Sequence, residues 1–214
     1  MKKFLSATLL SAILLLPTNS FATRELPNTS LSKLTVMDAL NARKTDRNFV
    51  DSDLTEAQLT KILWAANGVN RPDGKRVNPV ALGVYSVEVY AVTRKGIYLY
   101  DPKSNGLIPV AEGDYRMTTT TGQNFVGKAA VNLVYVENPD AWKNARHTPP
   151  PRENQISFAN ITVGSMIQSV ALAAQTEGLG NCVRGSINRD EFAKAARLSA
   201  DKTILLAQSV GNCN

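Results

Sequence analysis

The fold is decided by residues 41–85, which read Asn41-Ala-Arg-Lys-Thr-Asp-Arg-Asn-Phe49, then, after a helix start, Leu63-Trp-Ala-Ala-Asn-Gly-Val-Asn70, then Arg71-Pro-Asp-Gly-Lys-Arg-Val-Asn-Pro-Val-Ala-Leu-Gly-Val-Tyr85. The first segment places three cations and a hydroxyl together, at Arg43, Lys44, Thr45 and Arg47. Such a cluster suits a phosphate-bearing ligand. Cations at a helix C-terminus also complement the helix dipole without any ligand. Residue types alone leave both interpretations open.

Helix signals lie on either side of the basic cluster. Thr35 with Asp38, and Thr55 with Gln58, have the spacing of capping boxes, and Asn67-Gly68 is a typical helix stop. A long apolar segment at 158–177, rich in alanine and glycine, predicts a central, closely packed helix. Asn188 with Glu191 predicts a short helix near the C-terminus.

Strand patterns alternate with these helices. Alternating or continuous apolar runs predict strands near 84–92, 96–101, 129–136, 181–187 and 203–210, and residues 137–155 are expected to form a loop. Strands separated by helices, with a long apolar helix to cover, predict a central mixed sheet flanked by helices. The expected fold class is therefore an α+β sandwich.

The N-terminus has the features of an export signal. Lys2 and Lys3 precede an apolar run that is short for a membrane span, and Ser20-Phe21-Ala22 resembles a signal-peptidase site. We expect residues 1–22 to be a cleaved signal peptide and residues 23–214 to form one domain, in the periplasm or secreted. A retained membrane anchor is the alternative.

Composition excludes several classes of function. The formal charge of +6 falls to +4 without Lys2 and Lys3, and no dense basic run remains, so nucleic-acid binding is not expected. One histidine and two distant cysteines are too few for a zinc or haem site, so no metal is expected. His147 has no serine elbow to work with, which argues against a hydrolase. Cys182 and Cys213 could form one disulfide in an oxidising compartment, or both stay free.

The order of motifs along the chain resembles the nitroreductase family, in particular a secreted branch related to the dehydrogenases that make azoles in peptides. Besides residues 43–49 and 63–76, the resemblance rests on Leu54-Thr-Glu-Ala-Gln-Leu59, Gly96-Ile-Tyr-Leu-Tyr-Asp101, Gly122-Gln-Asn-Phe-Val126, Val131-Asn-Leu-Val-Tyr-Val136, Glu177-Gly-Leu-Gly180 and Val210-Gly211. It implies a homodimer that holds FMN at the subunit interface. It also implies electron transfer from a reduced nucleotide or other donor to a nitroaromatic, quinone or similar small acceptor.

The resemblance assigns binding roles position by position. The FMN phosphate and ribityl chain would be held by Arg43, Lys44, Thr45 and Arg47. The loop that a second subunit lays against the flavin corresponds to Pro79, Val80, Ala81, Gly83 and Tyr85, and the strand whose backbone faces the flavin corresponds to Arg184, Gly185 and Ser186. No catalytic side chain is implied, because the hydride chemistry belongs to the cofactor.

The flavin loop departs from the family pattern. Where the family has Ser, Asn and Gln, this chain has Val80, Gly83 and Tyr85, so side-chain hydrogen bonds worth roughly 1 kcal/mol each are lost. Tyr85 itself resembles a tyrosine of the peptide-dehydrogenase branch. Two alternatives to a small-molecule oxidoreductase therefore stay open, namely a non-enzymatic descendant that uses the old flavin cleft for ligand binding and a dehydrogenase acting on a peptide.

Overall fold

A computed structural model of the chain describes residues 23–27 and 33–214; the expected signal peptide lies outside these described residues. The strands are β1 (Arg24–Glu25), β2 (Val87–Thr93), β3 (Gly96–Asp101), β4 (Gly106–Glu112), β5 (Val131–Glu137), β6 (Gly180–Arg184) and β7 (Thr203–Gly211). The α-helices are α1 (Val36–Ala42), α2 (Glu56–Asn67), α3 (Arg152–Thr176) and α4 (Arg189–Ala195). Short 3-10 segments are η1 (Ala81–Gly83), η2 (Arg116–Thr119), η3 (Asn124–Gly127) and η4 (Pro139–Asn144).

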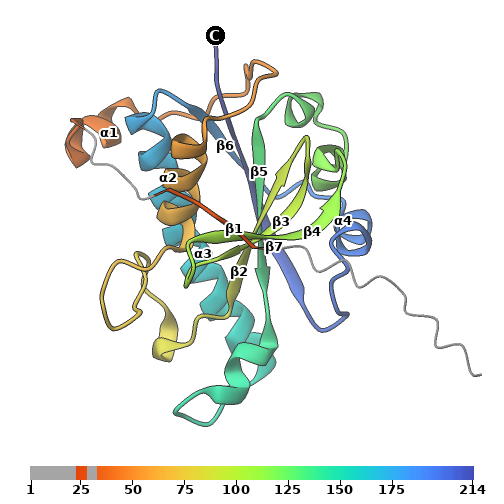
Figure 1. Ribbon diagram of the computed structural model, residues 1–214. Coiled ribbons are helices and arrows are strands. Elements are labelled where there is room, and N and C mark those ends of the chain that lie inside the picture. The colour runs from red at the N-terminus through yellow and green to blue at the C-terminus, as the bar shows by residue number, and fades with distance from the viewer. Residues whose placement is uncertain (1–22, 28–32) are drawn as a thin grey trace, which may run out of the picture.

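One sheet runs through the middle of the molecule, with α1, α2 and α3 on one side and α4 on the other (Figure 1). The strand order is β1-β4-β3-β2-β5-β7-β6. Alternate residues of the central strands supply the two cores, as the pleat requires. On β2, Val89 packs in the core under α2 and α3, whereas Tyr90 packs in the core under α4, where its ring meets Phe192 edge-on at 6.0 Å. The predicted α+β sandwich is confirmed.

The prediction of a mixed sheet is wrong, because every strand pair within the described residues is antiparallel. Helix α3 connects β5 to β6, and these strands run in the same direction because each is antiparallel to β7. The C-terminal strand β7 lies between them and keeps them from pairing directly. Element order along the sequence does not reveal that the last strand inserts.

Strand β4 carries no clear sequence signal, since Pro109 interrupts it. The short β1 pairs with β4 only at Gly106 and Leu107. Pro109 therefore lies on an open edge, where a missing backbone N–H costs no ladder hydrogen bond. The register between β3 and β4 also shifts beside this proline, between Ile97 and Tyr98.

Both predicted capping boxes are present. The hydroxyls of Thr35 and Thr55 accept from the backbone N–H groups of Asp38 and Gln58, and the side chains of Asp38 and Gln58 accept from the backbone N–H groups of Thr35 and Thr55. The start of α3 differs from expectation, because the helix begins at Arg152 and the predicted loop is shorter. Three consecutive prolines suggested a longer loop. A proline at the helix N-cap, here Pro151, loses no helical hydrogen bond, so the helix can start directly after it.

Helix α3 is half core and half surface. Its inner face buries Val163, Met166 and Val170, whereas Ile161 on its outer face is 68% exposed. Among the described residues it is the one helix whose length and apolar composition would suffice to cross a membrane, a test that core helices also pass. The prediction of a central helix is confirmed for one face, and the opposite face is uncovered in a single chain.

Candidate functional site

The basic segment directly follows α1. Arg43 caps the helix through its backbone N–H, which donates to the Ala39 carbonyl at 2.9 Å, and the last helical turn contains no basic residue. Arg43 therefore lies at the C-terminal end of the helix dipole, whereas Lys44 and Arg47 follow beyond the helix. Their side chains are exposed, and within the described residues their closest carboxylate contact is Lys44 Nζ to Asp46 Oδ2 at 3.8 Å. The structure leaves Arg43, Lys44 and Arg47 accessible to an anionic ligand.

A backbone hydrogen bond joins this segment to strand β6. The N–H of Asp46 donates to the carbonyl oxygen of Asn181 at 2.9 Å. The backbone groups of Asn181 therefore face away from β7, and strand alternation turns those of Val183 and then Gly185 toward the same side. Strand β6 is the last strand of the sheet, and Val183 is 38% exposed. The predicted phosphate cations thus adjoin the start of β6 near the upper end of Figure 1, and the predicted flavin-facing residues Arg184, Gly185 and Ser186 follow further along the same segment.

Arg184 differs from the other predicted site residues because its side chain is buried. Its guanidinium donates to Ser209 Oγ, to Asn132 Oδ1 and to both oxygens of Thr119, at 2.6 to 3.1 Å. No carboxylate of the described residues pairs with it, and burial lowers the pKa of Arg184 to about 10. Arg184 therefore fastens η2 to the sheet, and ligand contacts at this position are left to the backbone and to the exposed Gly185 and Ser186.

Several polar groups that the motifs did not single out line the same region. Ser186 and Thr121 form a hydrogen bond between their hydroxyl groups. Two residues after Thr121, the buried Oε1 of Gln123 has no hydrogen-bond partner in the described part of the chain. A neighbouring hollow of about 400 Å³ is lined by Arg47, Asn48, Phe49, Asn124, Phe125, Lys128 and Asn214. Gln123 could have been found from the sequence, because it is one of two polar residues, with Asn124, in the Gly122–Val126 motif.

Residues 79–85 lie at the opposite end of the molecule (Figure 1, yellow), so one chain does not bring them to the basic segment. Asn78 roots this loop: its Nδ2 donates to the carbonyls of Ala65 and Ala66, both at 2.8 Å, and its Oδ1 accepts from Ser169. Gly83 has a φ of 71°, a conformation that favours glycine.

Tyr85 is already engaged within its own chain. Its hydroxyl accepts from the backbone N–H of Arg76 at 3.2 Å, and the Arg76 guanidinium lies 4.3 Å from the ring centroid. The Val80 side chain has no hydrogen-bonding group. The loop therefore presents apolar and backbone groups rather than the family's polar side chains.

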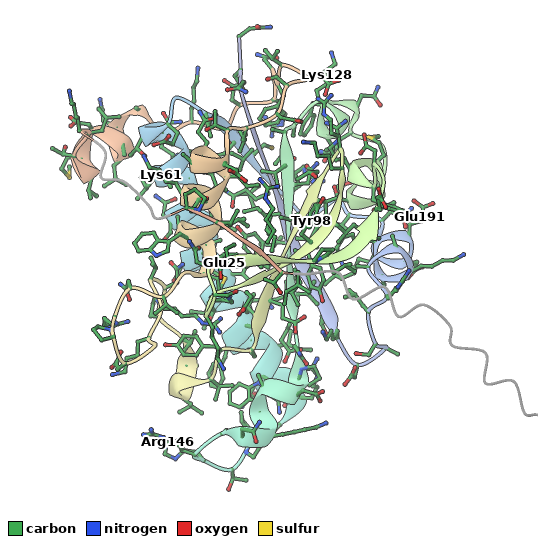
Figure 2. All side chains as sticks on the ribbon, viewed as in Figure 1. Glu25, Lys61, Tyr98, Lys128, Arg146 and Glu191 are labelled. Carbon is green, nitrogen blue, oxygen red and sulfur yellow. The ribbon has the colours of Figure 1, made fainter. Side chains whose placement is uncertain are left out.

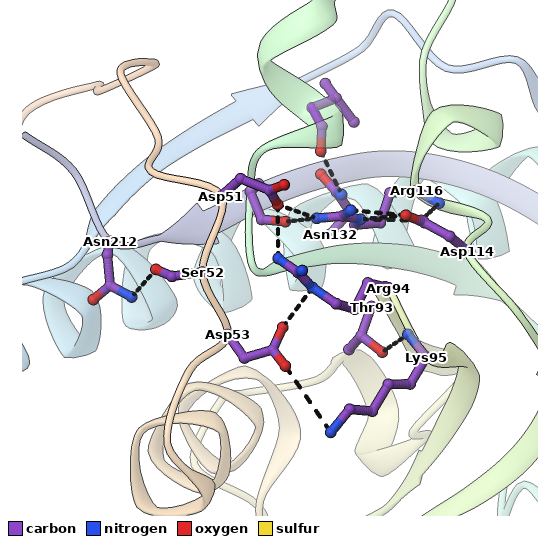
Figure 3. Close-up of polar contacts among 12 residues, drawn as sticks. Asp51, Ser52, Asp53, Thr93, Arg94, Lys95, Asp114, Arg116, Asn132 and Asn212 are labelled. Carbon is purple, nitrogen blue, oxygen red and sulfur yellow. Dashed lines mark hydrogen bonds and ion pairs between the residues drawn. The ribbon is translucent and has the colours of Figure 1, made fainter.

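The acidic residues Asp51, Asp53 and Asp114 have structural partners. Figure 3 shows Asp51 and Asp53 paired with Arg94, and Asp114 paired with Arg116 at 2.7 Å. The hydrogen bonds from Arg116 hold the pKa of Asp114 below its usual range. In residues 23–27 and 33–214 no three His, Cys, Asp or Glu side chains gather as metal ligands would.

Both cysteines are free thiols, so the possible disulfide does not form in this structure. Cys182 is buried beside Phe49, with its Sγ directed at the Val183 carbonyl at 3.6 Å. Cys213 packs at the rim of the same cluster, close enough to Asp46 for the carboxylate charge to act on its thiol. Burial first, and the Asp46 charge second, raise the pKa of Cys213 to about 11.

Known proteins with similar sequences identify the family of this chain. A family model described as the nitroreductase family matches residues 40–212.

The chain belongs to the nitroreductase family.

Solved structures of this nitroreductase fold include a candidate nitroreductase from Ralstonia eutropha JMP134, with 32% identity, a TM-score of 0.82, and coverage of 92% of this chain and 91% of that one. A chain of the Escherichia coli microcin synthetase McbBCD complex, with truncated pro-MccB17 bound, has 23% identity and a TM-score of 0.66 over 99% of this chain and 85% of that one. The Vibrio harveyi NADPH:FMN oxidoreductase complexed with NAD⁺ has 19% identity and a TM-score of 0.61 over 84% and 69%. The last two show a shared fold.

Proposed function

We propose that this nitroreductase is an exported, homodimeric FMN-dependent oxidoreductase that passes electrons from a reduced nucleotide or other donor to a nitroaromatic, quinone or similar small acceptor. The observation that carries the proposal is the hydrogen bond between Asp46 and Asn181 at 2.9 Å, which holds the basic segment against the open edge of β6. The cations suit a phosphate, and the unpaired strand edge offers backbone N–H and C=O groups to a flat ring system attached to it.

The residues present fit FMN in their donor chemistry. Arg43, Lys44, Thr45 and Arg47 would hold the phosphate and ribityl chain, because their charged and hydroxyl groups are exposed. The backbone of Gly185 and Ser186 would face the ring, and the buried, unpartnered Oε1 of Gln123 is an acceptor without a donor nearby. When bound, FMN supplies the hydride chemistry, so the protein residues bind, orient and exclude water.

A second copy of the chain completes the site in this proposal. Residues 79–85 are too far from the basic segment in one chain to contact the same ligand (Figure 1). The exposed apolar side chains of Val36 and Met37 on α1, at 67% and 71%, and of Ile161 on the adjoining α3, offer a surface for that copy. The homodimer would thereby bring the loop of one chain to the cations of the other.

The test is FMN titration of the purified mature chain, followed by flavin fluorescence, with any yellow colour and FMN release on denaturation recorded first. Replacing Arg43 by Ala removes one charge-assisted contact and should weaken FMN binding on the order of tenfold or more. Lys103→Ala, an exposed cation in the β3–β4 turn, is the matched control and should leave the affinity unchanged. Equal affinity for wild type and Arg43→Ala would refute the phosphate assignment.

A second candidate function, ligand binding without electron transfer, is favoured by the flavin loop. Val80 cannot hydrogen bond through its side chain, and the Tyr85 hydroxyl already accepts from the backbone N–H of Arg76. A protein that is colourless and that FMN titration cannot tint would support this candidate over the oxidoreductase. Export of the chain is tested separately, by fractionation and N-terminal sequencing, which should place the mature N-terminus at Thr23.

A further inference from the structure

A second, larger cleft opens at the end of the molecule away from the basic segment. It has a volume of about 790 Å³ and lies between the 71–85 loop and residues 141–147. Small-molecule sites in proteins have volumes of roughly 300–1,000 Å³, so the cleft can hold a ligand larger than a single ring. Figure 2 labels Arg146 at this end, on the loop after η4.

The charged rim of the cleft is positive. Lys75 is neutralised by Asp73, with Nζ and Oδ2 at 2.7 Å. Arg71 donates to neutral acceptors, the side chain of Asn70 and the carbonyl of Arg76, and neither Arg71 nor Arg146 forms an ion pair within the described residues. The Asp73 carboxylate lies near Arg71 as well as Lys75, so one carboxylate faces three cations at the mouth of the cavity and the rim keeps a positive excess. Planar guanidinium groups bind carboxylates and phosphates with two parallel hydrogen bonds.

The wall of the cleft is apolar and preformed. Val80, Leu82 and Tyr85 line it, and Leu82 is 52% exposed with a φ of 52°, a conformation that costs a branched residue roughly 1–2 kcal/mol. The bonds from Asn78 to α2 and α3 hold the loop in place without a ligand. An exposed leucine kept in a strained conformation on an anchored loop indicates a contact surface rather than a packing role.

We propose that this cleft binds a small anionic aromatic molecule, with its carboxylate or phosphate at Arg71 and Arg146 and its flat apolar body on Leu82 and Tyr85. The inference rests on the proposed function in one respect, because residues 79–85 would bring this ligand toward the flavin of a second copy. Binding itself requires no flavin. A neutral aromatic of the same size gains only the apolar burial, so the cleft selects for negative charge.

The experiment compares para-nitrobenzoate with para-nitrobenzamide by calorimetric titration into the mature full-length protein. These probes have nearly the same shape and differ in charge. The carboxylate should bind about tenfold more tightly or better, and added salt should reduce that difference. Arg146→Ala should remove most of the preference and leave amide binding unchanged, whereas Lys143→Ala, an exposed cation paired with Asp140 outside the cleft, should change neither. Equal affinity of the two probes for the wild type would overturn the inference.

A reduced dinucleotide and a carboxylated acceptor share this chemistry, so NADPH is titrated in parallel. Loss of NADPH binding in Arg146→Ala identifies the electron donor as the ligand. Unchanged NADPH binding, with weakened nitrobenzoate binding, identifies a small acceptor. The FMN titration separates the two proposals: an Arg146-dependent preference for the carboxylate in a protein that does not bind FMN upholds the cleft and refutes the oxidoreductase. FMN binding without any preference for the carboxylate refutes the cleft and upholds FMN binding.

Discussion

The guanidinium of Arg184 donates to Oδ1 of Asn132 at 3.1 Å, and the same oxygen accepts from Ser209 at 2.6 Å. This junction ties β6, β5 and β7 together beneath the candidate flavin edge. Further bonds from Arg184 reach Thr119, so η2 depends on it as well. A buried cation satisfied by neutral acceptors alone orders several segments at once.

Replacing Arg184 by Met should therefore lower the free energy of unfolding by about 2–4 kcal/mol, because the buried acceptors on Thr119 and Ser209 lose their donor, while Asn132 Oδ1 keeps only the bond from Ser209. Hydrogen exchange should also accelerate at residues 119–121, which Arg184 fastens to the sheet. Arg197→Met, at an exposed arginine after α4, is the control. A variant as stable as wild type, with unchanged exchange at 119–121, would contradict this role.

The pair of Glu137 and Arg152 sets the start of α3. Glu137 is fully buried, and both its oxygens accept from the Arg152 guanidinium at 2.5 Å. Arg152→Ala leaves a buried carboxylate unpaired and should cost about 3 kcal/mol in chemical denaturation. Lys143→Ala breaks an exposed pair that solvent screens, and should leave the denaturation midpoint essentially unchanged. Similar losses in both variants would show that burial of Glu137 does not matter.

The outer face of α3 should form part of the homodimer interface. Ile161→Asp places a charge among apolar side chains and should weaken dimerisation about tenfold or more, measured by light scattering over a dilution series. Ile108→Asp changes an exposed isoleucine on β4, away from that face, and should leave the dimer intact. A wild-type protein that is a monodisperse monomer at micromolar concentration would refute both the interface and the composite site.

The thiol of Cys213 should ionise only at high pH. Its pKa in the folded protein is raised from 9.0 to about 11, by burial first and then by the charge of Asp46. The folded thiol therefore keeps its proton where an unfolded one loses it, so this group favours the native state below pH 9.0 and loses that contribution as the pH rises through about 11. Alkylation of native protein, followed by mass spectrometry, should accelerate over this range. Asp46→Asn should shift the profile to lower pH; an unchanged profile would show that Asp46 does not act on the thiol.

Much of the local structure could be predicted because its causes lie within a few residues. The capping boxes at Thr35 and Thr55 are bonds between positions three apart, and each formed as expected. The basic segment at residues 43–47 is equally local. The start of α3 is at Arg152, before the predicted 158, because a run of prolines is typical of a loop and gives no sign that a helix begins directly after it.

The sequence by itself determined the family, the α+β class and the residues available to hold a phosphate, because motif order and side-chain chemistry are properties of the chain. The tertiary structure alone decided that β7 inserts between β5 and β6, that Arg184 turns inward while Arg47 stays exposed, and that residues 79–85 lie far from residues 43–47. The physical reason is that strand pairing and burial depend on the free energy of the whole folded chain, in which contacts between distant segments outweigh local preference.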